Sequence, residues 1–294
     1  MTDIECVVDA KAQLGESTYW DPTTEALWWI DIYQKAIHRF DPVSRQTETH
    51  IAPELLGCIA VRERGGLVLT MASGFYFFDS TTGHFDKITD PEESLPDNRF
   101  NDGKTDRQGR FWSGSMFEAP GKPVVKNASL YRMDADLSVH RIVEGIGCSN
   151  GLAWSPDSRT MYYTDSHGPV VWAWDFDPLT GDVENRRPYF DLSEMGGGVV
   201  DGSTVDAEGG YWATIPFQGK VLRFDPAGKL VRTIELPTDL PTCCEFGGRD
   251  LDTLYVTTAI YNRTPDQLAG QQNPGGLFAL DVGVKGLPLV PFKG

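Results

Sequence analysis

The chain has 294 residues, of which 40% are hydrophobic and 23% charged, and its formal net charge is −16 at pH 7. This length allows two average domains or one large closed β domain, and the composition is that of a soluble globular protein with a real core. The excess of acidic residues argues against nucleic acid or an anionic membrane surface as a partner, although solubility alone is enough to explain it.

The five cysteines are an odd number without CxxC spacing, which argues against a disulfide framework and against a thiolate zinc site. The first residues, Met1 to Cys6, have neither the basic nor the apolar region of a secretion signal. No apolar run approaches the length of a membrane-spanning helix. We therefore expect reduced cysteines, no membrane span and a cytoplasmic location.

A unit of about 40–55 residues recurs six times along the chain, which is the spacing of a repeat architecture. Each copy has an inner position, a turn, and then an apolar strand centre about nine to twelve residues further on. The inner positions are Glu16, Cys58, Asn101, Asn150, Asp201, and either Cys243 or Cys244. The strand centres are Trp28-Trp29, Leu67-Val68, Phe111-Trp112, Tyr162-Tyr163, Tyr211-Trp212 and Leu254-Tyr255.

A third apolar run, closed by an aspartate, follows in every unit, and a short fourth strand completes most units. Six units of four strands predict an all-β fold, a six-bladed β-propeller that forms a single domain over residues 1–294. We expect the ring to close by pairing of residues 4–8 with residues 278–280 or 287–291 of the last blade. No helix is expected, and the irregular stretches 118–129 and 261–276 are expected to overhang the channel mouth.

The first strand of each propeller blade lines the central channel, so its starting residue points inward. Four of the inner positions carry two carboxylates and two amides, at Glu16, Asn101, Asn150 and Asp201. Oxygen ligands with two negative charges suit a hard divalent cation such as Ca²⁺, Mg²⁺ or Mn²⁺. Asn-Gly and Asp-Gly are also common turn dipeptides, so each site alone is more simply a turn. The registration of all four favours a metal site in the channel.

Other potential functional groups are less informative. Asp102 and Asp106 are candidates for groups that support the ligands, although Asp106 more simply caps its own turn. None of the five histidines has metal-ligand spacing or stands at an inner position, so we interpret them as surface or core residues. The sequence has no serine-hydrolase elbow, phosphate-binding loop or dinucleotide fingerprint.

Several long segments resemble the gluconolactonase/regucalcin (senescence marker protein) family of sugar-acid lactonases, and the resemblance covers nearly the whole chain. They include residues 99–106 (RFNDGKTD), 109–116 (GRFWSGSM), 149–155 (SNGLAWS) and 201–203 (DGS). The resemblance implies one divalent metal in the channel, with Ca²⁺ favoured and Zn²⁺, Mn²⁺, Mg²⁺ or Fe²⁺ also compatible. It implies Glu16, Asn150 and Asp201 as metal ligands, Asp201 also as the catalytic acid/base, and Arg99, Asn101 and Glu118 as substrate-binding residues.

The chain departs from the family pattern at two places. Glu16 is followed by Ser17 and Thr18, where the family usually has a proline two residues after the glutamate. Glu245 stands where a small or apolar residue is more usual, and it either points outward harmlessly or alters the pocket.

The expected activity is metal-dependent hydrolysis of a five- or six-carbon, gluconolactone-like sugar lactone to its aldonic acid in carbohydrate catabolism. The partner is then a small molecule, and the protein is a monomer or a weak homo-oligomer. The alternatives are a phosphotriesterase-like metal hydrolase and a non-catalytic calcium-binding propeller. Arg99, Asn101 and Glu118 favour a polyhydroxylated substrate over a phosphotriester.

Overall fold

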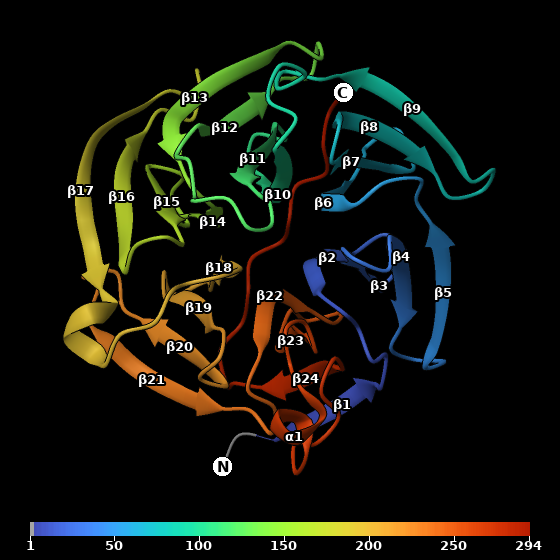
Figure 1. Ribbon diagram of the computed structural model, residues 1–294, viewed down its shortest axis with the longest axis vertical. Coiled ribbons are helices and arrows are strands. Elements are labelled where there is room, and N and C mark those ends of the chain that lie inside the picture. The colour runs from blue at the N-terminus through green and yellow to red at the C-terminus, as the bar shows by residue number, and fades with distance from the viewer. Residues whose placement is uncertain (1–2) are drawn as a thin grey trace.

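Six four-stranded sheets stand around a common axis in the computed structural model, which describes residues 3–294 (Figure 1). In each sheet, here called a blade, neighbouring strands are antiparallel, and five of the blades follow the order of the chain. The all-β six-bladed propeller predicted from the repeat is therefore confirmed. The predicted strand centres all fall on the second strand of a blade.

The first three blades consist of consecutive strands. Blade 1 contains β2 (Gly15–Asp21), β3 (Ala26–Asp31), β4 (Ala36–Asp41) and β5 (Gln46–Ile51). Blade 2 contains β6 (Leu56–Val61), β7 (Leu67–Met71), β8 (Gly74–Asp79) and β9 (His84–Thr89). Blade 3 contains β10 (Asn98–Thr105), β11 (Phe111–Phe117), β12 (Ala128–Met133) and β13 (Val139–Ile146).

The remaining blades include the one that joins the two ends of the chain. Blade 4 contains β14 (Ser149–Trp154), β15 (Thr160–Asp165), β16 (Val170–Phe176) and β17 (Val183–Asp191). Blade 5 contains β18 (Ser203–Val205), β19 (Tyr211–Ile215), β20 (Lys220–Phe224) and β21 (Leu230–Glu235). Blade 6 contains β22 (Pro241–Gly247), β23 (Thr253–Thr258), β24 (Leu277–Asp281) and β1 (Ile4–Val8).

The ring closes through β1, which pairs antiparallel with β24 so that Ile4 lies opposite Leu280. Of the two closures expected from the sequence, pairing with residues 278–280 is confirmed and pairing with residues 287–291 is wrong. Residues 282–294 instead leave blade 6 and cross the centre of the propeller toward blade 2 (Figure 1). Gly286 forms a bridge to Asp206 of blade 5, and Phe292 forms one to Arg62 of blade 2.

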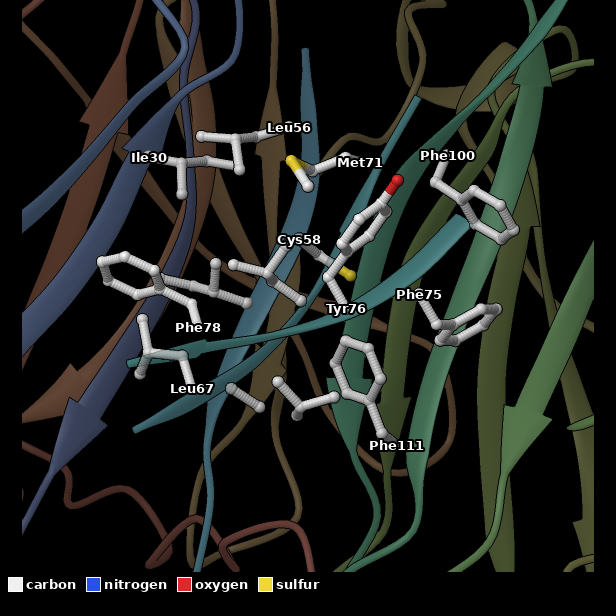
Figure 2. Packing of buried hydrophobic residues seen from close by; sticks show 14 of the residues in the cluster. Ile30, Leu56, Cys58, Leu67, Met71, Phe75, Tyr76, Phe78, Phe100 and Phe111 are labelled. Atoms are coloured by element: carbon white, nitrogen blue, oxygen red, sulfur yellow. The ribbon is translucent and has the colours of Figure 1, made fainter. Parts of the chain in front are cut away.

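The hydrophobic core lies between neighbouring blades. The second strands of the blades, such as β3 and β7, bury both of their faces, which explains why their sequences read as continuous apolar runs rather than alternating patterns. Figure 2 shows the cluster between blades 1, 2 and 3, where the ring of Phe75 lies edge-on to Phe100 at 5.1 Å between centroids. Such offset and edge-on pairs are the favoured arrangement of aromatic rings.

Two short helical turns interrupt the expected all-strand structure. They are η1 (Leu192–Met195), a 3₁₀ turn, and α1 (Pro265–Leu268), which lies within the irregular stretch 261–276. The expectation of no helix was wrong for this turn because it depends on a local capping box: Thr264 Oγ1 accepts from Gln267 N, and Gln267 Oε1 accepts from Thr264 N. No helix within residues 3–294 has the length and apolar character needed to cross a membrane.

The cysteines and histidines are as expected. All five cysteines are free thiols, and three of them, Cys58, Cys243 and Cys244, are buried. Among the histidines, His38 packs against Trp29 with ring centroids 4.0 Å apart, and burial lowers the pKa of its imidazole to about 4.

Phe292 anchors the crossing segment, so its truncation should destabilise the whole propeller. The side chain is fully buried in the cluster between blades 1, 2 and 3. We expect Phe292→Ala to lower the free energy of unfolding by about 3–5 kcal/mol, as for other large-to-small core substitutions. Urea denaturation measures this loss, and Lys293→Ala, at an exposed neighbour, should change stability by less than about 0.5 kcal/mol. An equal effect of both variants would contradict the anchoring role.

Candidate functional site

The inner strands are irregular at the level where the sequence predicts a ring of polar side chains. In five blades the pairing of the first two strands shifts register there, between Glu16/Tyr19, Leu56/Ile59, Phe100/Gly103, Asn150/Ala153 and Pro241/Cys243. A β-bulge locally re-aims the side chains of its strand. In blade 5 the ring residue, Asp201, precedes the first strand, β18, and its N donates a hydrogen bond to Thr214 O.

All six residues predicted as site residues line one pocket of about 220 Å³. They are Glu16, Arg99, Asn101, Glu118, Asn150 and Asp201. The structure thus brings together groups from blades 1, 3 and 4 and from the loop that enters blade 5. None of the five histidines lines this pocket.

The pocket also contains residues that the sequence did not reveal. Blade 6 contributes Thr242, so the expectation that Cys243 or Cys244 takes the ring position was wrong. Cys58 does not line the pocket; its thiol lies against Thr70 and Ser113. Tyr33, Phe217 and Tyr261 also line the pocket, from loops whose approach to the channel cannot be read from strand patterns. Of the stretches 118–129 and 261–276, only the first residue of each reaches it.

The two ring carboxyls, Glu16 and Asp201, are buried near other acidic groups. Burial, followed by the charges of Asp201 and Asp102, raises the pKa of Glu16 well above its ordinary value. Burial and the charge of Asp102 likewise raise the pKa of Asp201 to about 8, although Arg99 and a hydrogen bond from Asn150 oppose this shift. Ionising both carboxyls together is therefore costly without a compensating cation.

Arg99 cannot fully supply that cation because its charge is already paired. Its Nε donates to Glu118 Oε2 at 2.6 Å, and its Nη1 donates to Phe100 O at 2.9 Å and Asn101 Oδ1 at 3.0 Å. Glu118 also accepts from Tyr33 Oη at 2.5 Å. Arg99 and Glu118 thus form a fixed polar pair at one side of the pocket.

The two amides are held in defined orientations. Asn101 Nδ2 donates to Ser149 O at 2.9 Å and to Asn150 Oδ1 at 3.2 Å, while Asn150 Nδ2 donates to Ser166 Oγ at 2.9 Å. The ring therefore presents carboxylate and amide oxygens from different strands in one pocket. Such an oxygen-only donor set, with two carboxylates that lack a free counter-charge, fits a hard divalent cation.

Asp102 connects two of the inner strands through hydrogen bonds to their backbone N–H groups. Its Oδ1 accepts from Gly103 N at 2.9 Å, and its Oδ2 faces Leu152 N, at 3.4 Å, in the bulge that follows Asn150. Burial raises the pKa of Asp102 to about 6, although Lys104 opposes the shift. Asp106 instead accepts from the backbone N–H groups of Gln108 and Arg110, which confirms that it caps its own turn.

The loop of Glu16 reaches the pocket without the proline that usually follows it in the family. Ser17 adopts a left-handed backbone conformation, with φ of +51°, and its N donates to Glu16 Oε2 at 3.1 Å. Ser17 Oγ also accepts from Ile59 N of the neighbouring blade at 2.8 Å. The serine thus fastens the bulge by hydrogen bonds.

Glu245 fits neither interpretation considered from the sequence. It is 1% exposed, so the outward orientation was wrong, and it does not line the pocket of the ring. Its carboxylate accepts from Lys104 Nζ at 2.6 Å and from Thr204 Oγ1 at 2.7 Å. These groups line a separate cavity of about 30 Å³ covered by residues 287–290, which has room for little more than water.

Fold and pocket together define a six-bladed propeller with an acidic, amide-bearing site in its channel. A family model described as SMP-30/Gluconolactonase/LRE-like region matches residues 14–260. The chain belongs to this SMP-30/gluconolactonase family, as the resemblance in its sequence predicted.

Two curated relatives and one solved structure show how closely the chain resembles other members. It is 37% identical to a regucalcin of Danio rerio over 99% of this chain and 98% of the relative. It is 34% identical to a 6-deoxy-6-sulfogluconolactonase of Pseudomonas putida over 99% of both chains. The structure of a calcium-binding protein, regucalcin, from Agrobacterium tumefaciens superposes with a TM-score of 0.92 at 26% identity, over 98% of this chain and 96% of that one. The enzyme class predicted from the sequence, a lactonase, is thereby confirmed at the level of the family.

Removing one partner of the Glu245–Lys104 pair should destabilise the fold without changing the ring pocket. Glu245→Ala leaves a buried ammonium group unpaired, so we expect a loss of about 3–5 kcal/mol in the free energy of unfolding. The double variant Lys104→Met/Glu245→Leu removes both charges and should recover most of that loss. Urea denaturation of both variants checks this, and the divalent-metal affinity of Glu245→Ala, which keeps Lys104, is the control. A change in metal affinity beyond about twofold would place Glu245 in the site after all.

Proposed function

We propose that the protein is a metal-dependent lactonase that opens a five- or six-carbon sugar lactone, gluconolactone-like, to its aldonic acid. The observation that carries this proposal is the meeting of Glu16, Asn150 and Asp201 with the Arg99–Glu118 pair in one pocket. Membership of a family that includes a 6-deoxy-6-sulfogluconolactonase supports it. A place in carbohydrate catabolism follows from such a reaction.

Glu16, Asn150 and Asp201 would hold one divalent cation. Their oxygens suit Ca²⁺, and the structural neighbour from Agrobacterium tumefaciens is a calcium-binding protein. Zn²⁺, Mn²⁺, Mg²⁺ and Fe²⁺ are compatible with the same donors. A cation bound there polarises the lactone carbonyl and stabilises negative charge on its oxygen.

The side chains of the pocket account for the remaining steps. Asp201 accepts a proton from the water that attacks the carbonyl carbon, and returns a proton to the ring oxygen as the ester C–O bond breaks. Asn101 and the Arg99–Glu118 pair line the same pocket as the ring carboxyls and would bind sugar hydroxyls. Burial and the neighbouring charge of Asp102 favour proton uptake by Asp201, as its raised pKa indicates.

A non-catalytic calcium-binding role is the second candidate, favoured by the likeness to the calcium-binding regucalcin of Agrobacterium tumefaciens. The same ring would bind the ion in both cases. The two candidates differ in whether the protein turns over a substrate with Asp201 as the proton acceptor. A phosphotriester is a further substrate to include in the assay because metal-polarised hydrolysis is not specific to lactones.

Asp201→Asn tests the assignment of the catalytic residue. With metal-stripped protein, single metals added back and a pH indicator, we expect wild-type protein to hydrolyse one or two aldonolactones of a five- and six-carbon panel. Asp201→Asn should lower that rate at least about 100-fold, because it removes the proton acceptor and one anionic ligand.

Asp250→Asn, at an exposed carboxyl on the surface, is the matched control and should retain full activity. Turnover of a phosphotriester but of no lactone would reassign the substrate class. Calcium binding without turnover of any substrate would favour the binding role.

Metal binding should release protons and tighten as the pH rises. The raised pKa values of Glu16 and Asp201 mean that the metal-free folded protein holds more protons than the unfolded chain between about pH 4 and about pH 8. The stability that these carboxyls contribute is complete below about pH 4 and is lost as the pH approaches 8, whereas a cation requires both to be ionised.

Calorimetry at pH 6 and pH 8, in buffers of different ionisation enthalpy, measures both quantities. We expect higher metal affinity at pH 8 and a net proton release at pH 6. Equal affinities with no proton release would show that these carboxyls are already ionised in the metal-free protein.

A further inference from the structure

Three aromatic side chains line one part of the pocket and are here called the aromatic rim: Tyr33, Phe217 and Tyr261. They come from three loops, which follow β3, connect β19 to β20 and follow β23. The rings of Tyr33 and Tyr261 are stacked, with centroids 4.7 Å apart and planes 19° apart. The rim therefore gives the polar pocket an extended apolar wall.

Phe217 holds its place at a conformational cost. It has a φ of +66°, a left-handed conformation that favours glycine or asparagine and is strained for an aromatic residue. Its side chain is 55% exposed, so burial in the core does not explain the choice of residue.

The neighbouring loop braces the ring of Phe217. The guanidinium of Arg263 lies 4.6 Å from its centroid, in a cation–π arrangement. Arg263 Nη2 is itself 3.0 Å from a carboxylate oxygen of Asp239. The exposed ring of Phe217 is thus held in a fixed position by Arg263, where it is available for contact with a ligand.

The charges of the pocket restrict that ligand. Among its lining residues within 3–294 the only cationic side chain is that of Arg99, which is paired with Glu118. Arg263 lies outside the lining and is held by Asp239 and Phe217. A phosphate or sulfonate on the substrate would therefore find no unpaired cationic side chain among the described residues that line the pocket.

On the basis of the proposed lactonase function, we infer that the aromatic rim is a stacking subsite for the C–H face of an uncharged sugar lactone. Phe217 is its specificity-determining residue, and lactones that carry a phosphate or sulfonate are disfavoured. Aromatic side chains commonly line such sites and give binding area with little loss of conformational freedom.

Phe217→Gly separates a binding role from a structural one because it removes the ring and the backbone strain together. For the uncharged lactone that wild-type protein hydrolyses best, we expect KM to rise about tenfold while kcat stays within about twofold. The melting temperature should stay the same or rise, since glycine accepts the left-handed conformation. Phe217→Tyr should restore the wild-type KM.

Leu179→Ala is the matched control, since Leu179 is another exposed apolar residue, 90% exposed and outside the pocket. It should change neither KM nor kcat. The charge requirement is tested by comparing D-glucono-1,5-lactone with its 6-phosphate, for which we expect a kcat/KM at least tenfold lower.

Two results would overturn the inference alone: an unchanged KM in Phe217→Gly, or a phosphorylated lactone hydrolysed as well as the uncharged one. A lower melting temperature in Phe217→Gly with unchanged KM would show that the ring serves the fold only. Failure of wild-type protein to hydrolyse any lactone with any metal would instead overturn the proposed function, and this inference with it.

Discussion

The burial of two carboxyl groups in one pocket is the constraint on which the rest of the site depends. Glu16 and Asp201 come from segments almost two hundred residues apart, and a propeller that needed only stability could place apolar side chains there. Their raised pKa values record the cost of bringing them together. Since Arg99 is paired with Glu118, it offsets part of that cost, and protons or a bound cation are needed for the rest. The pocket therefore combines two buried carboxyls with an independent polar pair, Arg99 and Glu118.

The fold makes this arrangement possible because the pairing of the first two strands is irregular at the level of the ring. Register shifts interrupt the pairing of the first two strands in five blades, while the second and third strands of the same blades pair without a shift. Asp102 and Ser17 then fasten two of the bulges by hydrogen bonds to backbone groups. The first strands of the blades are thus irregular where they carry the site, and the strands next to them are regular. This division lets a stable fold carry a strained, charged site.

The repeat made much of this structure predictable. Six aromatic or apolar strand centres and six closing aspartates specify the blades, because period and turn chemistry are local properties of the sequence. The ring residues were predictable because the same position carries a carboxylate or an amide in four of the six repeats. The aromatic rim and Glu245 were not, since Tyr33, Phe217 and Tyr261 lie in loops and the partner of Glu245, Lys104, is 141 residues away. The single turn of α1 was not predicted because a capping box of two residues, Thr264 and Gln267, has no hydrophobic periodicity.

The pairing of β1 with β24 affects the order in which the blades can form during synthesis and folding. Blade 6 takes three strands from residues 241–281 and one from residues 4–8, so it stays incomplete until β24 has been synthesised. Until then the first strand and the edge of the last blade have no partner. Because such distant contacts close slowly, the finished ring forms as a late event. Asp201, which precedes the last two inner strands, therefore meets Glu16 in its final setting only when the two ends of the chain have found each other.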